Sequence, residues 1–220
     1  AYSYAAQGWL MENDINPYEG YPGLLPGVFA DQVAQEWRFT RTPYGPLSLQ
    51  LQHDIVRLAG FHPYWSAVMM RIPALVGVVL IGVFLPRLAR RTGHDASFAA
   101  WFGVLNPLLV VDFVGGAHND SFMMGLMVFG LWLATTASWA WIPAALVIGA
   151  SAAVKQPAVM AAVALPFIVH PMPSWRPRHV ATALGRVVGS LVGAAGSFSL
   201  LTWRTGLGFG WYPAPEGRAG

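Results

Sequence analysis

Cysteine is absent from the sequence, and charged residues are scarce. The lack of cysteine excludes disulfide bonds and thiolate metal ligands. Only 10% of the residues are charged and 55% are hydrophobic, whereas soluble domains carry roughly 25% charged residues. The arginines are scattered rather than clustered, so the sequence shows no footprint of nucleic-acid binding. This composition excludes an ordinary soluble domain and predicts an all-α membrane protein.

Six apolar segments follow one another after residue 66, without an internal repeat or a low-complexity tract. A membrane-spanning helix needs roughly 20 apolar residues, and several of the segments approach this length. We therefore expect a polytopic transmembrane helix bundle over residues 67–203, with a further extracytoplasmic loop beginning in 204–220. The segments are 67–86, 97–115, 120–137, 139–153, 157–170 and 182–203.

The fourth and fifth apolar segments are short, and the sequence KQP, Lys155–Pro157, separates them. Proline has no backbone N–H and ends or kinks a helix. A break at membrane depth is tolerated only where the backbone lines a cavity or is buried in protein. The break at Lys155 is therefore a candidate functional feature, and Asn106-Pro107 predicts a second kink.

Residues 1–66 form the only sizeable polar region of the chain. The region is rich in tyrosine, tryptophan, proline and glycine, which favour turns and a position at the depth of the lipid headgroups. A short amphipathic helix is predicted over residues 47–58. We expect an ordered extracytoplasmic loop that lies on the membrane face and contacts membrane lipid.

Arginine-rich short loops orient a membrane protein, because such loops stay in the cytoplasm. Two loops qualify here, and the even number of apolar segments between them lets both lie on the cytoplasmic side. The extracytoplasmic side then receives residues 1–66, the turn at 115–120 and the break at Lys155. The sequence thus predicts a multi-pass cell-membrane protein whose active face is extracytoplasmic. The arginines are Arg87, Arg90 and Arg91 in the first loop, and Arg176, Arg178 and Arg186 in or beside the second.

The motif GGAHND, Gly115–Asp120, places an imidazole, an amide and a carboxylate between two apolar segments. Ionisable groups at such a junction are costly and mark functional sites. Asp120 is a candidate catalytic residue, although Asp120 or Asn119 would also serve as a helix N-cap. His118 is a candidate substrate ligand, since one histidine near one aspartate is a weak metal signal. A carboxylate here could bind sugar hydroxyls or act as a base. No cofactor is expected, and dependence on a divalent metal is left open.

Two cations are candidates for binding a phosphate. Lys155 interrupts an otherwise apolar stretch, and the alternative is a lysine that extends to the interface from a helix end. Arg71 lies about one turn into the first apolar segment and is either a phosphate ligand or an interfacial anchor. Asp112 is expected to pair with Arg71 or Lys155 in a structural role.

Short motifs occur in a fixed order along the chain. They are Tyr2–Gly8, Asn16–Tyr18, Thr42–Leu47, Asn106–Leu108, Gly115–Asp120, Lys155–Pro157 and Gly206–Trp211. In this order they resemble the motifs of actinobacterial polyprenol-phosphate-mannose-dependent α-1,6-mannosyltransferases, which are GT-C glycosyltransferases of cell-envelope lipomannan assembly. GGAHND together with TPYGPL is the most specific part of the resemblance. It implies a GT-C-like membrane enzyme whose active site lies between the first extracytoplasmic loop and the outer ends of the helices.

The resemblance also implies a catalytic acidic residue near the start of the YSYAAQG piece. In this chain that position is Ala1 or upstream of it, and Asp14 is a poor substitute. We therefore expect the chain to be a fragment of a longer protein that lacks its catalytic base and is inactive by itself.

The predicted function is transfer of mannose from a polyprenyl-phosphate-mannose donor to a mannan or lipoglycan acceptor. An acidic residue would deprotonate the acceptor hydroxyl, and Lys155 and Arg71 would stabilise the departing phosphate. Asp120, His118 and Asn119 would position sugar hydroxyls. Tyr2, Tyr44 and Trp9 are candidates to stack on the sugar or cover the site. Two other classes stay open: a transporter or flippase for a lipid-linked or sugar substrate, and a structural subunit of an envelope-synthesis complex.

Overall fold

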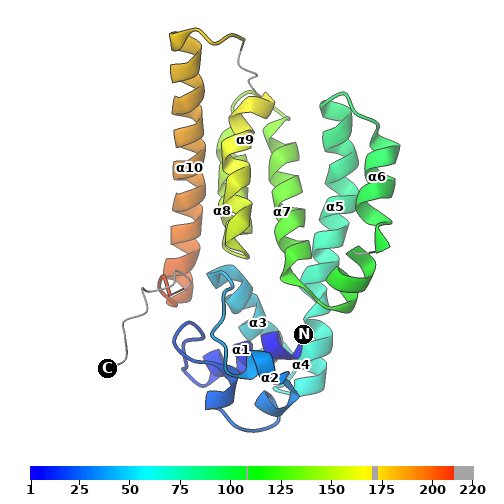
Figure 1. Ribbon diagram of the computed structural model, residues 1–220, viewed down its shortest axis with the longest axis vertical. Helices are drawn as coiled ribbons and strands as arrows, with labels where there is room; N and C mark the ends of the chain where they lie inside the picture. Colours follow the sequence, from blue (N-terminus) through cyan, green and yellow to red (C-terminus); the bar gives the residue numbers. More distant parts are fainter. Residues whose placement is uncertain (108, 170–172, 211–220) are drawn as a thin grey trace.

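The computed structural model describes residues 1–107, 109–169 and 173–210. Within these ranges the chain consists of helices and their connections and contains no β-strand, which confirms the all-α prediction. Leu108 and Trp211 of the motifs lie outside the described residues, as do the ends of the predicted segments 157–170 and 204–220. Figure 1 shows a bundle of long helices and, across one end of it, a layer of short helices.

The N-terminal layer has its own apolar core, which includes Tyr4, Phe29 and Val56. α1 and α3 pack closely within it, because a Cβ on Gly8 would lie only 2.5 Å from the carbonyl oxygen of Gln52. α3 occupies the segment predicted as an amphipathic helix. The elements are α1 (Tyr2–Glu12), η1 (Pro22–Leu24), η2 (Ala30–Gln32), α2 (Gln35–Arg38), α3 (Pro46–Leu58) and α4 (Pro63–Met69).

The bundle is held by close contacts between small residues, as is usual where lipid replaces water around helices. A Cβ on Gly125 of α7 would lie 2.7 Å from the carbonyl oxygen of Gly77 in α5. α8 and α10 meet in the same way at Gly149 and Ala194. The elements are α5 (Arg71–Arg91), α6 (Ala96–Val104), η3 (Leu109–Gly115), α7 (Asn119–Ala134), α8 (Trp141–Ala152), η4 (Gln156–Val159), α9 (Met160–Val169) and α10 (Pro177–Thr205).

The helices are shorter than the six predicted apolar segments suggest. Only the stretches 63–91 and 177–205 are long and apolar enough, among the described residues, to cross a membrane as continuous helices. α6 and η3 form a pair bent by 53°, which would make a third span if counted as one. This bend lies at the predicted Asn106-Pro107 kink. α7 has 16 residues and extends about 24 Å, and α8 and the η4–α9 stretch are also short, because turns and breaks end them.

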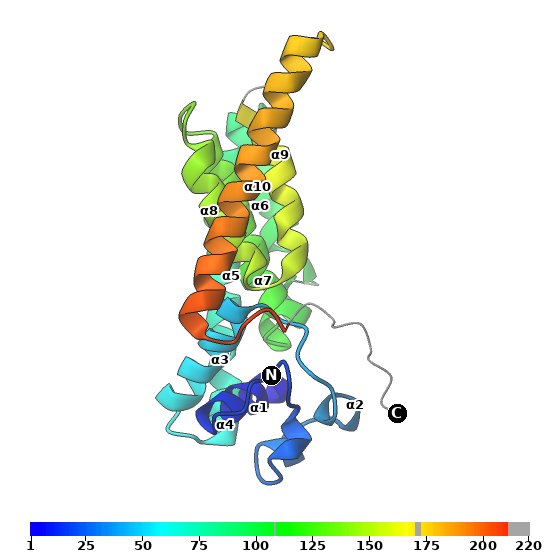
Figure 2. The same cartoon turned by 90° about the vertical axis from the view of Figure 1, so that its left-hand side faces the viewer.

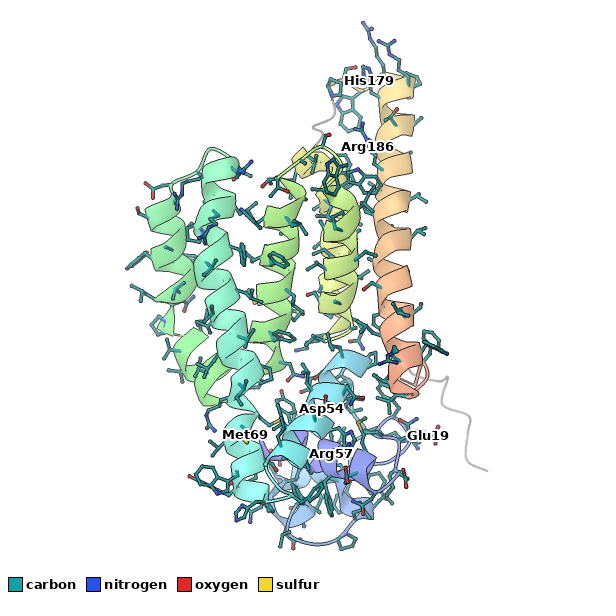
Figure 3. All side chains as sticks on the ribbon, turned by 180° about the vertical axis from the view of Figure 1, so that it is seen from behind. Glu19, Asp54, Arg57, Met69, His179 and Arg186 are labelled. Atoms are coloured by element: carbon teal, nitrogen blue, oxygen red, sulfur yellow. The ribbon has the colours of Figure 1, made fainter. Side chains whose placement is uncertain are left out.

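The helices of the bundle run alternately up and down, as two perpendicular views show (Figures 1 and 2). The arginine-rich ends of α5 and α10 therefore lie far from the N-terminal layer. Figure 3 shows His179 and Arg186 toward the far end of α10, and Asp54 in the layer. The guanidinium of Arg91 donates to the carbonyl oxygen of Thr135 at 3.2 Å and joins the far ends of α5 and α7. Which side of the membrane each end faces stays a prediction.

Candidate functional site

Two helix ends meet where α3 begins and α8 stops. The first N–H groups of a helix and its last carbonyl groups have no partner within the helix, so each end can satisfy the other. The backbone nitrogen of Gly45 donates to Val154 O at 3.0 Å, and that of Leu47 donates to Ala153 O at 2.9 Å. A Cβ on Gly45 would lie 2.2 Å from Ala153 O, so this approach requires glycine. The TPYGPL motif is thereby docked on the break before Lys155.

Asn16 of the NPY motif connects the layer to the segment that follows α10. Its side-chain nitrogen donates to Leu207 O at 3.1 Å, and its side-chain oxygen accepts from the backbone nitrogen of Tyr18 at 3.1 Å. The Tyr18 hydroxyl donates to Tyr44 O at 2.9 Å. Motifs far apart in the sequence thus form one hydrogen-bonded network, and this network fixes the position of Tyr44.

Lys155 and Asp120 form an ion pair with 2.7 Å between Nζ and Oδ1. Both side chains are about one-third exposed, at 33% and 27%. Asp120 lies in the first turn of α7, where the helix dipole favours a negative charge. The N-cap residue of α7 is His118, and its side chain makes no capping hydrogen bond. Asp120 is therefore not the N-cap that the sequence left open as an alternative.

Asn119 is buried and points toward α3 rather than toward open space. It is 8% exposed, and its side-chain nitrogen donates to Ser48 Oγ at 2.6 Å. Gln52 also donates to Ser48 Oγ, at 3.0 Å. This cluster ties the start of α7 to α3. Asn119, a predicted sugar ligand, therefore has a structural role in the described geometry.

A cavity of about 310 Å³ lies between the N-terminal layer and the turn that contains GGAHND. Its walls come from the start of α1, the segment around α2, the TPYG piece and the turn before α7. Three predicted site residues line it: Tyr2, Tyr44 and His118. The full set is Ala1, Tyr2, Ser3, Tyr4, Gln7, Gln32, Ala34, Trp37, Thr40, Arg41, Pro43, Tyr44, Gly116 and His118.

Tyr4 is a buried residue of this cavity that the sequence reasoning did not single out. Its hydroxyl donates to the Tyr44 hydroxyl at 3.3 Å and lies 3.5 Å from His118 Nδ1. Burial, followed by the proximity of Tyr44, raises the pKa of Tyr4 above its usual value. Tyr4 therefore remains a neutral phenol and connects two side chains of the cavity wall. Its place in the YSYAAQG piece was the available signal.

Trp9 does not reach the cavity. Its ring stacks on Phe29 with centroids 4.9 Å apart and meets Phe61 edge to face at 5.8 Å. Trp9 lies farther along α1 than the cavity-lining Tyr2 and Tyr4, and it packs in the core of the layer. The predicted stacking of Trp9 on the sugar therefore has no support in this geometry.

Arg71 donates to Gly115 O at 3.1 Å, directly beside the cavity-lining Gly116. Asp112 is exposed. Its predicted pairing with Arg71 or Lys155 is wrong, because Lys155 pairs with Asp120 and Arg71 bonds to a backbone carbonyl.

Among the described residues, no group of three histidine, aspartate or glutamate side chains is arranged to hold a metal ion. The polar groups of the cavity are hydroxyls, amides, an imidazole and a guanidinium. Such groups suit the hydroxyls of a sugar and the oxygens of a phosphate.

These features define a helical membrane protein with a polar cavity between the N-terminal layer and one end of its helix bundle. The family model for the alpha-(1->6)-mannopyranosyltransferase N-terminal domain matches residues 1–172. The chain belongs to this family, which confirms the resemblance drawn from the motifs.

The curated relatives agree with this assignment. An alpha-(1->6)-mannopyranosyltransferase A of Corynebacterium glutamicum is 31% identical over 99% of this chain and 46% of its own length. An alpha-(1->6)-mannopyranosyltransferase A of Mycobacterium tuberculosis is 32% identical over 98% of this chain and 42% of its own length. The chain thus spans less than half the length of these relatives. No solved structure matches the chain.

Proposed function

We propose that the full-length protein containing this chain is a membrane mannosyltransferase. It moves mannose from a polyprenyl-phosphate-mannose donor to an α-1,6-mannan or lipoglycan acceptor on the extracytoplasmic face of the cell membrane. The observation that carries the proposal is the cavity shared by three family motifs: YSYAAQG, TPYGPL and GGAHND. The names of the relatives, which are alpha-(1->6)-mannopyranosyltransferases, support the sugar and the linkage.

In this proposal the sugar lies in the cavity. Tyr2 and Tyr44 offer aromatic faces and hydroxyls, and His118 offers a ring nitrogen for a sugar hydroxyl. The hydrogen bond from the Tyr18 hydroxyl to the backbone carbonyl of Tyr44, and the contact with the Tyr4 hydroxyl, hold Tyr44 in place before substrate arrives. Preorganised donors of this kind lower the cost of ordering the site during the reaction.

The base that the resemblance implies would reach the cavity from directly before α1. Ala1 lines the cavity, so a carboxylate directly before it would lie near the acceptor hydroxyl. It would take the hydroxyl proton as the acceptor oxygen bonds to the anomeric carbon and the bond from that carbon to the phosphate oxygen breaks. The polyprenyl phosphate leaves with the bonding electrons and one more negative charge.

Asp120 and Lys155 have a positioning role in this proposal. Their charges offset each other, so Lys155 offers a phosphate less attraction than a free lysine would. The pair instead holds the turn that contains His118 against the helix break at Lys155. At this break the backbone of the TPYGPL motif bonds to the end of α8. Arg71, whose described partner is a neutral carbonyl, retains its charge for an anionic ligand.

The transporter alternative has no support from the comparisons. The polar groups that it would require near the middle of the membrane are instead gathered at one end of the bundle, under the loop layer. The structural-subunit alternative predicts that the cavity residues can change without loss of mannose transfer.

The test uses the full-length protein in liposomes, with labelled polyprenyl-phosphate mannose and an α-1,6-linked mannan acceptor. His118→Ala should lower transfer by about tenfold or more, because a hydrogen bond to the sugar is lost. The matched control is His94→Ala, an exposed histidine in the turn after α5. His94→Ala should retain wild-type activity. Equal activity of wild type and His118→Ala would show that the sugar does not bind at His118 in this cavity. Absence of transfer by the wild type would overturn the proposed function.

A further inference from the structure

Arg41 is a cation without a partner in the cavity wall. It lies in the segment between α2 and the TPYG piece, and its side chain lines the cavity. Four other cations in the layer or near the cavity are engaged, and Arg204 at the end of α10 is exposed and outside the cavity lining. Arg38 pairs with Asp31, Arg57 with Glu12, Lys155 with Asp120, and Arg71 bonds to Gly115 O. Within the described chain, Arg41 has neither an ion pair nor a hydrogen bond.

The cavity wall contains no carboxylate among its described residues. Arg41 is therefore the one formally charged side chain among these described lining residues. Arg71 is outside the lining, but it donates to Gly115 O, directly beside the cavity-lining Gly116. The remaining polar lining consists of neutral groups. Because none of these lining residues pairs with the Arg41 guanidinium, its positive charge attracts an anionic ligand into the cavity.

We propose that Arg41 binds the phosphate of the lipid-linked donor, in place of the Lys155 that the sequence pointed to. This inference rests on the proposed function, because it assigns the charged part of that donor to one wall of the same cavity. A guanidinium presents a planar fork of N–H donors that fits two phosphate oxygens at once. Trp37, Thr40 and Gln32 line the same cavity and add polar and aromatic groups to it.

The assignment also explains how the leaving group is stabilised. The donor is a phosphodiester with one negative charge, and the departing polyprenyl phosphate carries a second. An arginine that already contacts the phosphate becomes more strongly attracted as this charge develops, so it contributes more to the transition state than to substrate binding. Loss of Arg41 should therefore lower kcat as well as raise KM for the donor.

The experiment compares wild type, Arg41→Gln and Arg41→Lys in the full-length protein, in liposomes of phosphatidylcholine alone and in liposomes with added phosphatidylglycerol. Two quantities are measured: mannose transfer, and binding of labelled polyprenyl phosphate without the sugar. Arg204→Gln is the matched control, since Arg204 is an exposed arginine in the last turn of α10 that does not line the cavity. Arg41 is exposed and unpartnered, so its substitution should leave thermal stability unchanged.

We expect Arg41→Gln to weaken polyprenyl-phosphate binding and to raise KM for the donor by about tenfold or more in both lipid mixtures. Arg41→Lys should recover part of the loss, and Arg204→Gln should behave as wild type. Unchanged binding and KM in Arg41→Gln would overturn the inference while leaving the mannosyltransferase proposal intact. An effect confined to anionic liposomes would overturn it as well, because Arg41 would then bind bilayer headgroups. Arg41-dependent binding by a wild type that transfers no mannose would uphold the phosphate site and overturn the proposed function instead.

Discussion

Lys155 of the helix break and Asp120 of α7 are joined by a 2.7 Å ion pair, although 35 positions separate them in the sequence. The pair connects the turn that carries His118 to the backbone joint between α3 and α8. It lies at the boundary between the N-terminal layer and the bundle. At this position the ion pair holds the two parts together, which neither charge would do alone.

Breaking the ion pair should destabilise the protein by about 1 kcal/mol, because each single change leaves the partner charge partly buried and unpaired. Asp120→Asn and Lys155→Gln should each lower the Tm and the mannose transfer of the full-length protein. The double variant should lose less than the sum of the two, since no lone charge remains. Thermal unfolding and transfer are measured for wild type, the two single variants and the double variant, which together form a double-mutant cycle. Additive effects would show that the two side chains act independently, and Asp112→Asn, at an exposed carboxylate, serves as the control.

Gly45→Ala should separate the loop layer from the bundle. Its new methyl group would lie 2.2 Å from Ala153 O, against backbone that cannot move aside. We expect a loss of more than about 2 kcal/mol in stability, with loss of transfer, because the joint positions both Tyr44 and the break. Gly196→Ala in α10 is the opposite case, since no atom lies within 4 Å of the added Cβ. It should leave stability unchanged or raise it by roughly 0.5 kcal/mol. Equal thermal unfolding of the two variants would contradict the close approach at Gly45.

The meeting of the GGAHND turn and the KQP break at one end of the bundle could be predicted from the sequence. Alternating helix directions place every second connection at the same end, and this depends only on the number of apolar segments. The partner of Lys155 could not be predicted in this way. Asp112 and Asp120 lie eight residues apart, and only the structure shows that Asp112 is exposed within η3 whereas Asp120 in the first turn of α7 reaches the lysine.

The roles of individual residues in the N-terminal layer could not be predicted from the sequence either. α1 carries aromatic side chains at Tyr2, Tyr4 and Trp9, so its composition does not tell which of them faces the cavity. The structure places Tyr2 and Tyr4 in the cavity wall and Trp9 against Phe29. No feature of the sequence marked Arg41 as a candidate ligand, because an isolated arginine in a polar loop is ordinarily solvated. Its lack of a partner becomes visible only once the cavity around it is known.

Tyr4→Phe should change both the activity and the alkaline stability of the protein. The substitution keeps the buried ring but removes the hydroxyl that contacts Tyr44 and lies near His118, so transfer should fall several-fold with the fold intact. The pKa of Tyr4 is raised in the folded state, chiefly by burial. An unfolded chain therefore loses the phenolic proton first, and the stabilising difference declines as pH rises above about 10. The wild-type Tm should fall more steeply than that of Tyr4→Phe between pH 9 and about 11. Tyr18, whose pKa burial also raises, contributes in the same direction to both proteins. Parallel pH curves would indicate that Tyr4 ionises alike in both states.

The orientation of the protein in the membrane can be tested with single cysteines, because the 220 residues of this chain contain none. Glu19→Cys lies in the N-terminal layer, and Arg178→Cys lies beside His179 toward the far end of α10; both native side chains are exposed (Figure 3). Arginine-rich connections are retained in the cytoplasm, so the layer and its cavity should face outward. A membrane-impermeant maleimide should therefore label Glu19→Cys in intact cells and Arg178→Cys only after the membrane is opened. Each variant must first transfer mannose as well as the parent protein without the added cysteine, so that labelling reports on a folded protein, and any cysteine outside these 220 residues is replaced first. The reverse labelling pattern would place the cavity in the cytoplasm, and a donor carried outside the cell would then be unable to reach Arg41.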